Sequence, residues 1–169
     1  LTITVFVFTL ISSLEITAQD FKKLDKSPMD MAAFPSSYKV SDKMVKVIYS
    51  RPQLKGRDLV KLAPPQKVWR TGANEAAEIT FYKDVVFGGK EVKAGTYSLF
   101  TIPSSDGDWT VIINRAKNVW GSYYYNEDQD VVRVSGKVSK SEKTIEAFSM
   151  MFDKNMTLKM GWGNTVVSV

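Results

Sequence analysis

The chain has 169 residues, of which 44% are hydrophobic and 12% aromatic, and a formal net charge of +5. These values indicate one folded domain and exclude a disordered chain. Cys and His are both absent, which excludes a Ser-His-Asp triad, a Cys nucleophile, and zinc or haem sites held by thiolate or imidazole. We therefore expect no metal and no cofactor, and any acid–base chemistry has to use a carboxylate, Lys or Tyr.

Residues 1–18 are expected to be a signal peptide. Leu1 to Leu14 is apolar apart from Thr and Ser, and Ile16-Thr17-Ala18 resembles the small-residue site where a signal peptidase cuts. The run is too short for a comfortable membrane span. Because the usual basic start is missing, we interpret it as an N-terminally clipped signal, and a buried N-terminal strand is the alternative. The sequence thus predicts an exported protein, periplasmic or extracellular, with no transmembrane segment after cleavage.

The charge balance bears on possible partners. Glu15 is the one charged residue of the expected signal peptide, so its removal makes the remainder one unit more positive than the chain's +5. A cationic exported protein tends to stay near anionic surfaces such as acidic polysaccharide. Export makes nucleic acid a poor candidate partner, and the oligomeric state does not follow from the sequence.

Short alternating segments dominate the rest of the chain. Residues 19–43 show no sustained period and are expected to wrap the surface as an N-terminal segment. Met44–Tyr49 alternates as a half-buried strand, and Gly56–Leu62 is expected to hold one helical turn that ends before Pro64. Further strands are predicted at Ile79–Phe81, Val85–Phe87, Lys90–Val92, Thr96–Ile102, Trp109–Asn114, Val131–Val138, Ile145–Phe152, Met156–Trp162 and Thr165–Val169.

These elements define the expected fold. Gly88-Gly89 is a two-residue hairpin signal. Thr96–Ile102 carries large apolar residues at both odd and even positions, so both faces of this strand should be covered. Nine or ten short strands with little helix predict an all-β fold, an antiparallel β-sandwich of jelly-roll type. Residues 44–169 would form it as a single domain. One sheet closed on itself is the alternative.

The segment Val68–Glu75 is the strongest candidate for a binding site. Trp69 offers a flat apolar face for a sugar ring, and Arg70 offers a fork for a carboxylate or phosphate. Asn74 can donate and accept hydrogen bonds, as polyhydroxy ligands require, and Glu75 adds a carboxylate. The structural alternative is that Trp69 fills the core while Arg70 pairs with Glu75 to fix the loop.

A second aromatic group follows the strand at 109–114. Trp120 and three successive tyrosines, Tyr123 to Tyr125, can form a stacking platform beside Arg51 or Arg70. In a strand, Tyr123 and Tyr125 would share a face. Aromatic cover at the edge of the sandwich is the alternative. We expect no catalytic residue, and the predicted ligand-binding set is Arg51, Trp69, Arg70, Asn74, Glu75, Trp120, Tyr123 and Tyr125.

Two groups of acidic residues could bind a metal ion or act as catalysts. Asn126, Asp128 and Asp130 alternate like the first half of a calcium loop, but the Gly and the distal Glu are absent, so a solvated turn is favoured. Glu75 with Glu78, or Glu75 with Asp84, could serve as a carboxylate pair for glycoside hydrolysis, which needs a separation of about 5–10 Å across a cleft.

Several motifs occur in a recognisable order. They are Tyr49-Ser50-Arg51-Pro52, Gly56-Arg57, Val68 to Ala76, Ala94 to Pro103, Trp109 with Asn114, and Trp120-Gly121. From about Met44 to the C-terminus, this order resembles a bacterial family known as domain of unknown function 2911. The resemblance implies an exported envelope protein with one β-rich domain, and it implies no particular activity.

Three functions remain open at this level. We favour a non-catalytic module that binds a glycan or an anionic envelope polymer. A structural or partner-binding envelope protein would instead show an exposed apolar patch without a pocket. A hydrolase would show two carboxylates facing each other in a deep pocket near Glu75.

Overall fold

The computed structural model describes residues 21–169, so the expected signal peptide at 1–18 lies outside the described residues. Within this range, none of the helices has the length and apolar character needed to span a membrane. The elements are β1 Met29–Phe34, β2 Val45–Ser50, α1 Leu59–Leu62, β3 Ala77–Phe81, β4 Val85–Phe87, β5 Lys90–Val92, β6 Gly95–Ile102, β7 Trp109–Asn114, a 3₁₀ turn at Glu127–Gln129, β8 Asp130–Phe152 and β9 Leu158–Ser168.

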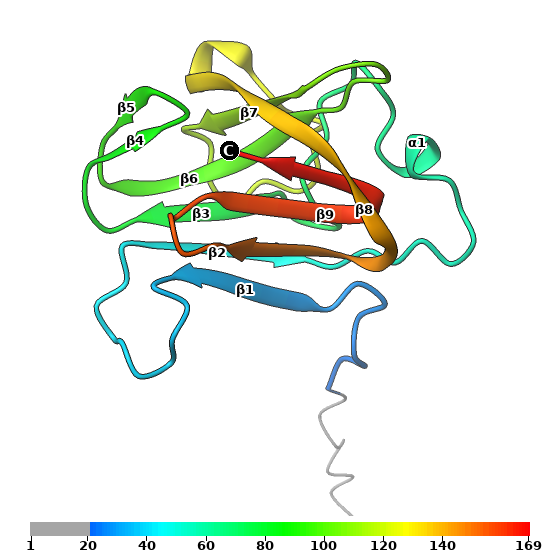
Figure 1. The fold of residues 1–169 in the computed structure, drawn as a ribbon, viewed down its shortest axis with the longest axis horizontal. Helices are drawn as coiled ribbons and strands as arrows, with labels where there is room; N and C mark the ends of the chain where they lie inside the picture. The colour runs from blue at the N-terminus through cyan, green and yellow to red at the C-terminus, as the bar shows by residue number, and fades with distance from the viewer. Residues whose placement is uncertain (1–20) are drawn as a thin grey trace, which may run out of the picture.

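Seven strands form one curled antiparallel sheet in the order β1-β2-β3-β6-β7-β8-β9, and β4 and β5 form a separate two-stranded hairpin (Figure 1). The prediction of an all-β, antiparallel fold with little helix is confirmed. The hairpin turns at Gly88-Gly89 as predicted, because both glycines adopt a positive φ, which a two-residue turn requires.

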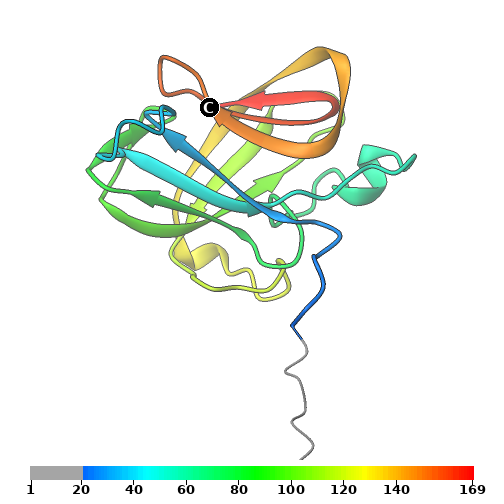
Figure 2. The same ribbon diagram turned by 90° about the horizontal axis from the view of Figure 1, so that it is seen from below.

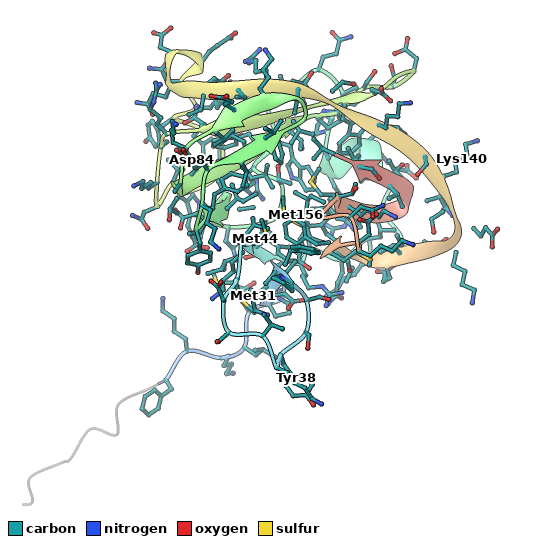
Figure 3. The ribbon with its side chains drawn as sticks, turned by 60° about the vertical axis from the view of Figure 1, so that its left-hand side comes forward. Met31, Tyr38, Met44, Asp84, Lys140 and Met156 are labelled. Atoms are coloured by element: carbon teal, nitrogen blue, oxygen red, sulfur yellow. The ribbon has the colours of Figure 1, made fainter. Side chains whose placement is uncertain are left out.

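The long strand β8 makes two layers out of this single sheet. Lys137–Lys140 pairs with Thr165–Ser168, and the register then shifts so that Ser149–Phe152 pairs with Leu158–Gly161. The outer bend carries Lys140 into solvent (Figure 3). The two strands expected at 131–138 and 145–152 are therefore one. The polar residues between them stay extended but largely exposed, so they show no apolar alternation. β9 likewise unites two expected strands.

The far end of β8 reaches back to the segment that follows β2. Gln53 bridges Ala147, and the Phe148 N–H donates to the Pro52 carbonyl at 2.9 Å. The Tyr49 hydroxyl also accepts the Met150 N–H at 2.8 Å. Together these contacts join the end of β8 to β2 and the segment after it, which closes the curled sheet on one side. Figure 2 shows the β8–β9 ribbon and the segment 117–130 on opposite sides of the molecule.

The outer face of β6 and β7 is covered as well as the inner face. Leu99 of β6 belongs to the main core, whereas Phe100 and Ile112 form a second small cluster with Ala76 on the other face. Tyr125 packs against this second cluster. The expectation that both faces of Thr96–Ile102 are covered is confirmed. The segment that covers the outer face also carries the second group of candidate site residues.

The strand β1 was not predicted. It pairs with β2 from Met29↔Ser50 to Phe34↔Val45, so the sheet begins within the segment expected to wrap the surface. Ala32 is its one buried residue, while Met29 and Met31 face solvent. An edge strand with so little buried surface leaves no apolar alternation for sequence reasoning to detect.

Candidate functional site

The segment 68–76 begins as part of the sheet and then leaves it. Trp69 bridges Thr101 of β6, with backbone N–H to O distances of 2.7 and 3.0 Å. The Ala77 N–H donates to the Arg70 carbonyl at 3.0 Å, which closes the excursion 71–76 where β3 starts. Trp69 and Arg70 therefore lie along β6, whereas Asn74 and Glu75 lie on a loop that projects from it.

The start of this loop is tightly constrained. Thr71 has a φ of 53°, which is unusual for a β-branched residue and costs on the order of 1–3 kcal/mol. Its Oγ1 lies 3.3 Å from the Trp69 carbonyl and 3.3 Å from Thr101 Oγ1. A Cβ on Gly72 would lie 3.1 Å from the Ser50 carbonyl oxygen. The loop is thus held against the end of β2 in one conformation.

Trp69 belongs to the core. Its side chain is 5% exposed and stacks on Trp162 at a centroid distance of 5.5 Å and an interplanar angle of 15°. Phe148 and Trp109 meet it edge-on at 5.0 and 6.3 Å. The ring is enclosed by these aromatic neighbours and presents no face to solvent, as in the structural alternative for this residue.

Arg70 and Glu75 do not pair. Of the salt bridges found within residues 21–169, none joins these two side chains, so the ion pair expected in the structural alternative is wrong. The reason is geometric, because Arg70 remains alongside β6 while Glu75 pairs with a different segment. Arg70 Nε is buried and has no hydrogen-bond partner among the described residues. Glu75 is exposed.

Glu75 lies directly opposite Trp120 in an isolated antiparallel bridge. The Ala76 N–H donates to the Val119 carbonyl at 2.9 Å, and the Gly121 N–H donates to the Asn74 carbonyl at 2.9 Å. Directly opposed residues of an antiparallel pair project their side chains to the same side. The bridge therefore places an exposed carboxylate beside an indole that is 58% exposed, although 45 positions separate Glu75 from Trp120 in the sequence.

The three tyrosines do not form a strand, so the expected sharing of a face is wrong. Residues 121–124 form a turn, in which Gly121 has a φ of 68°. A Cβ on Gly121 would lie 2.7 Å from the Tyr123 ring, so this ring lies over the Gly121 backbone, next to Trp120. Tyr123 and Tyr124 are 78% and 83% exposed. Both rings are exposed on the turn that directly follows Trp120.

Tyr125 turns inward instead. Its ring meets Phe100 edge-on at 5.1 Å, and its hydroxyl donates to Asp130 Oδ2 at 2.6 Å. Arg133 Nη2 donates to the same hydroxyl at 2.7 Å. Desolvation and the bond to Asp130 raise the pKa of Tyr125 to about 12. Its hydroxyl is committed to this network, which fixes the segment from Tyr125 to Asp130 against Arg133 of β8.

Arg51 is committed in the same way. Nη1 pairs with Asp30 at 3.0 Å, Nε donates to the Phe148 carbonyl at 3.0 Å, and Nη2 donates to Ser149 Oγ at 2.7 Å. The guanidinium thus ties β1 to the end of β8. Of the predicted set, only Glu75, Trp120 and Tyr123 gather at one exposed place, with Asn74 supplying backbone contacts beneath them.

A cleft of about 260 Å³ adjoins this place, and we call it the Glu75 cleft. The lining residues are Met29, Ile48, Tyr49, Ser50, Glu75, Ala76, Glu78 and Asn118. Glu78 Oε1 accepts the Asn118 N–H at 2.8 Å, which fixes one carboxylate in the wall. Two carboxylates and no basic residue line the cleft, so its charge is opposite in sign to that of the whole chain.

Sequence reasoning missed several of these lining residues. Ile48 carried a usable signal, because its position in β2 puts it on the same face as Lys46, the face away from the core. A single exposed Ile is ordinary on a protein surface, and it becomes informative here only because Met29 and Met31 of β1 are exposed beside it. Met29 and Asn118 carried no such signal, because their places depend on β1 and on the segment after β7.

The acidic turn at 126–130 is committed to local contacts. Asn126 Oδ1 accepts the Asp128 N–H at 3.0 Å. Asp130 accepts bonds from Asn114 Nδ2 at 2.7 Å and Arg133 Nε at 2.6 Å, besides the bond from Tyr125. Within residues 21–169 no group of three or more acidic residues is placed to hold a metal ion.

Comparison with known proteins adds the family. Residues 27–169 match the family described as Protein of unknown function (DUF2911). No significant match is found among curated proteins or solved structures. The matched range includes every strand from β1 to β9, so it covers the curled sheet and all the residues that line the Glu75 cleft. The chain therefore belongs to the DUF2911 family.

Proposed function

We propose that this protein is a non-catalytic glycan-binding module whose ligand lies across the Glu75 cleft and stacks on Trp120. The single observation that carries the proposal is the bridge between Glu75 and Trp120, which sets an exposed indole beside an exposed carboxylate at the edge of a cleft. Sugar rings combine apolar C–H faces with hydroxyl donors. An aromatic face next to a carboxylate acceptor complements both.

The negative charge of the cleft limits the kinds of sugar that can bind there. Glu75 and Glu78 are the charged groups that line it, so a sugar unit held there is uncharged or carries a positive group. An anionic unit would meet two carboxylates and be repelled. This support is specific to the Glu75 cleft and does not extend to Trp69 or Arg51, which are held in the core and in the β1–β8 contact.

The size and location of the cleft fit this role. A volume of about 260 Å³ is slightly below the range of about 300–1,000 Å³ that encloses small-molecule ligands. One sugar unit of a longer chain can rest there while its neighbours remain in solvent. Export to the periplasm or the cell exterior is part of the proposal. It is supported by the apolar run Leu1 to Leu14 and the small-residue site at 16–18.

A glycan array followed by calorimetry tests the proposal. Trp120→Ala should weaken binding of the selected glycan at least tenfold, which corresponds to about 1.4 kcal/mol. Glu75→Gln should weaken it less, because the amide keeps one acceptor oxygen. Tyr38→Ala is the matched control, since Tyr38 is 89% exposed on the β1–β2 connection (Figure 3). The cleft residues Met29 and Ser50 lie at the opposite end of the β1–β2 pair.

Two outcomes would reject the proposal. Either no glycan binds, or Trp120→Ala and Tyr38→Ala behave alike. In the first case the exposed apolar side chains Met29, Met31 and Ile48 around the cleft become the main observation, and they favour the structural or partner-binding alternative.

Carboxylate-dependent hydrolysis is the second candidate, and one observation favours it: Glu75 and Glu78 line the same cleft. A glycosidase needs one carboxyl as acid and one as nucleophile or base. Release of reducing ends from the glycan that binds tests this directly. If wild-type protein releases them and both Glu75→Gln and Glu78→Gln stop the release, the protein is a hydrolase and the non-catalytic proposal is wrong.

A further inference from the structure

A second depression is lined by Arg115 and Lys117, which directly precede Asn118 of the Glu75 cleft in the sequence. It has a volume of about 460 Å³, and we call it the Arg115 depression. Its principal lining side chains are Glu91, Lys93, Thr96, Tyr97, Arg115 and Lys117. Three of these are basic and one is acidic, whereas the Glu75 cleft is lined by two acidic residues. The motif Ala94 to Tyr97, which the glycan proposal does not use, forms one wall.

The charge of Lys93 is neutralised by Asp84, and this ion pair fixes the loop between β5 and β6. Lys93 Nζ lies 2.8 Å from Asp84 Oδ2, and Asp84 Oδ1 accepts the Ala94 N–H at 2.8 Å. The hydrogen bond from Lys93 lowers the pKa of Asp84, and the bond to Asp84 raises the pKa of Lys93. The Tyr97 hydroxyl donates to the Lys93 carbonyl at 3.0 Å. One side of the depression is therefore preformed.

The other two basic residues are not compensated. Arg115 and Lys117 form no salt bridge with any residue in the part of the chain that the structure describes. Glu91 is the one acidic residue that lines the depression with them. Two like charges that share a concavity repel each other, and an anion placed between them removes that repulsion.

The backbone that carries these two cations is held firmly. The Arg115 N–H donates to the Gln129 carbonyl at 2.9 Å, and the Ala116 N–H donates to Asn114 Oδ1 at 2.9 Å. The Ala116 carbonyl accepts both the N–H and the hydroxyl of Ser98, at 3.2 and 2.8 Å. The side chains of Arg115 and Lys117 thus extend from an anchored segment, so less backbone entropy is lost when they close on a ligand.

We propose that the Arg115 depression binds an oxyanion, a carboxylate or a phosphate group, with Arg115 as a two-pronged donor and Lys117 as a second positive charge. Arginine matches the planar geometry of carboxylate and phosphate oxygens, and lysine adds attraction without a fixed direction. The site is independent of the Glu75 cleft, because it uses different side chains and the opposite charge. Binding at either place can be lost while the other remains.

The test is a titration of isotope-labelled protein followed by amide NMR, with inorganic phosphate in one arm and an oligogalacturonate in the other. In at least one arm, signals of Ala94–Tyr97 and Arg115–Lys117 should move together and saturate. The tighter of the two ligands identifies the source of the oxyanion. A neutral oligosaccharide should leave these signals in place at the same concentration. The Trp120 indole signal reports the Glu75 cleft separately, so failure of one site is distinguished from failure of the other.

Variants decide whether the effect is local. Arg115→Gln with Lys117→Gln should weaken oxyanion binding at least tenfold, and both side chains are exposed, so the fold should persist. Lys143→Gln with Lys154→Gln removes the same charge from exposed positions outside the depression and should change affinity less than twofold. Equal weakening by the two pairs would overturn the proposal in favour of attraction to the whole cationic chain. Absence of saturable shifts in both arms would overturn it as well.

Discussion

Replacing each of two tryptophans by alanine separates the core from the candidate site. Trp69 is 5% exposed and contacts three aromatic rings at 5.0–6.3 Å, so Trp69→Ala removes a large buried side chain. Such a change costs about 3–5 kcal/mol. In a chain of this size each kcal/mol lowers the melting temperature by about 2–4 °C. The expected shift is therefore about 6–20 °C. Trp120 is 58% exposed, and Trp120→Ala should change stability by no more than about 0.5 kcal/mol.

The assay is unfolding in urea and by heat, followed by far-UV circular dichroism, with each variant referred to its own folded and unfolded baselines because the stacked Trp69–Trp162 pair contributes to the signal. If Trp69→Ala does not fold, Trp69→Phe keeps an aromatic ring against Trp162 and should show a smaller, measurable loss. Destabilisation of similar size in Trp69→Ala and Trp120→Ala would refute the assignment of one indole to the core and the other to the surface.

Three further predictions concern packing and pH. Gly136→Ala should cost about 1–3 kcal/mol, because its Cβ would lie 2.6 Å from a Val111 methyl carbon, while Gly107→Ala should be nearly neutral in the same unfolding assay. The pKa of Tyr125 is raised from 10.0 to about 12 in the folded protein. The free energy of unfolding should therefore fall as the pH rises from 10.0 towards about 12, because the unfolded chain loses this proton first. Tyr125→Phe should make that decline shallower. The pKa of Asp153 is lowered from 3.8, mainly by the hydrogen bond from the Asn155 N–H. The ionised Asp153 therefore stabilises the fold above pH 3.8, and this stabilisation is lost as the pH falls. In acid unfolding experiments, Asp153→Asn should reduce the loss of stability.

Much of the fold could be predicted because local patterns and the final structure agree. β2, β6 and β7 alternate between core and the opposite face as their sequences indicate. Gly88-Gly89 turns where a two-residue hairpin is expected. The curl could not be predicted, because it depends on polar residues 139–144 of β8 staying extended in solvent. No local pattern distinguishes such a stretch from a loop.

The candidate site was predicted only in part, and the reason is long-range pairing. Trp69 and Trp120 are the same residue type, and both lie on segments just outside the main strands. Trp69 bridges Thr101 and packs in the core, whereas Trp120 bridges Glu75 and faces solvent. Which bridge forms depends on residues 30–45 positions away. The commitment of Arg51 to Asp30 likewise depends on β1, which has almost no apolar signal. Sequence reasoning could therefore name the loop but not its orientation.

The most direct measurement of the central claim uses the indole N–H signals of the four tryptophans in a ¹H–¹⁵N NMR spectrum. Trp120→Phe assigns one signal, and the glycan selected by array is then titrated into wild-type protein. We predict that the Trp120 signal moves and saturates while those of Trp69, Trp109 and Trp162 stay in place. Movement of the Trp69 signal without movement of the Trp120 signal would contradict the placement of the site at the Glu75 cleft.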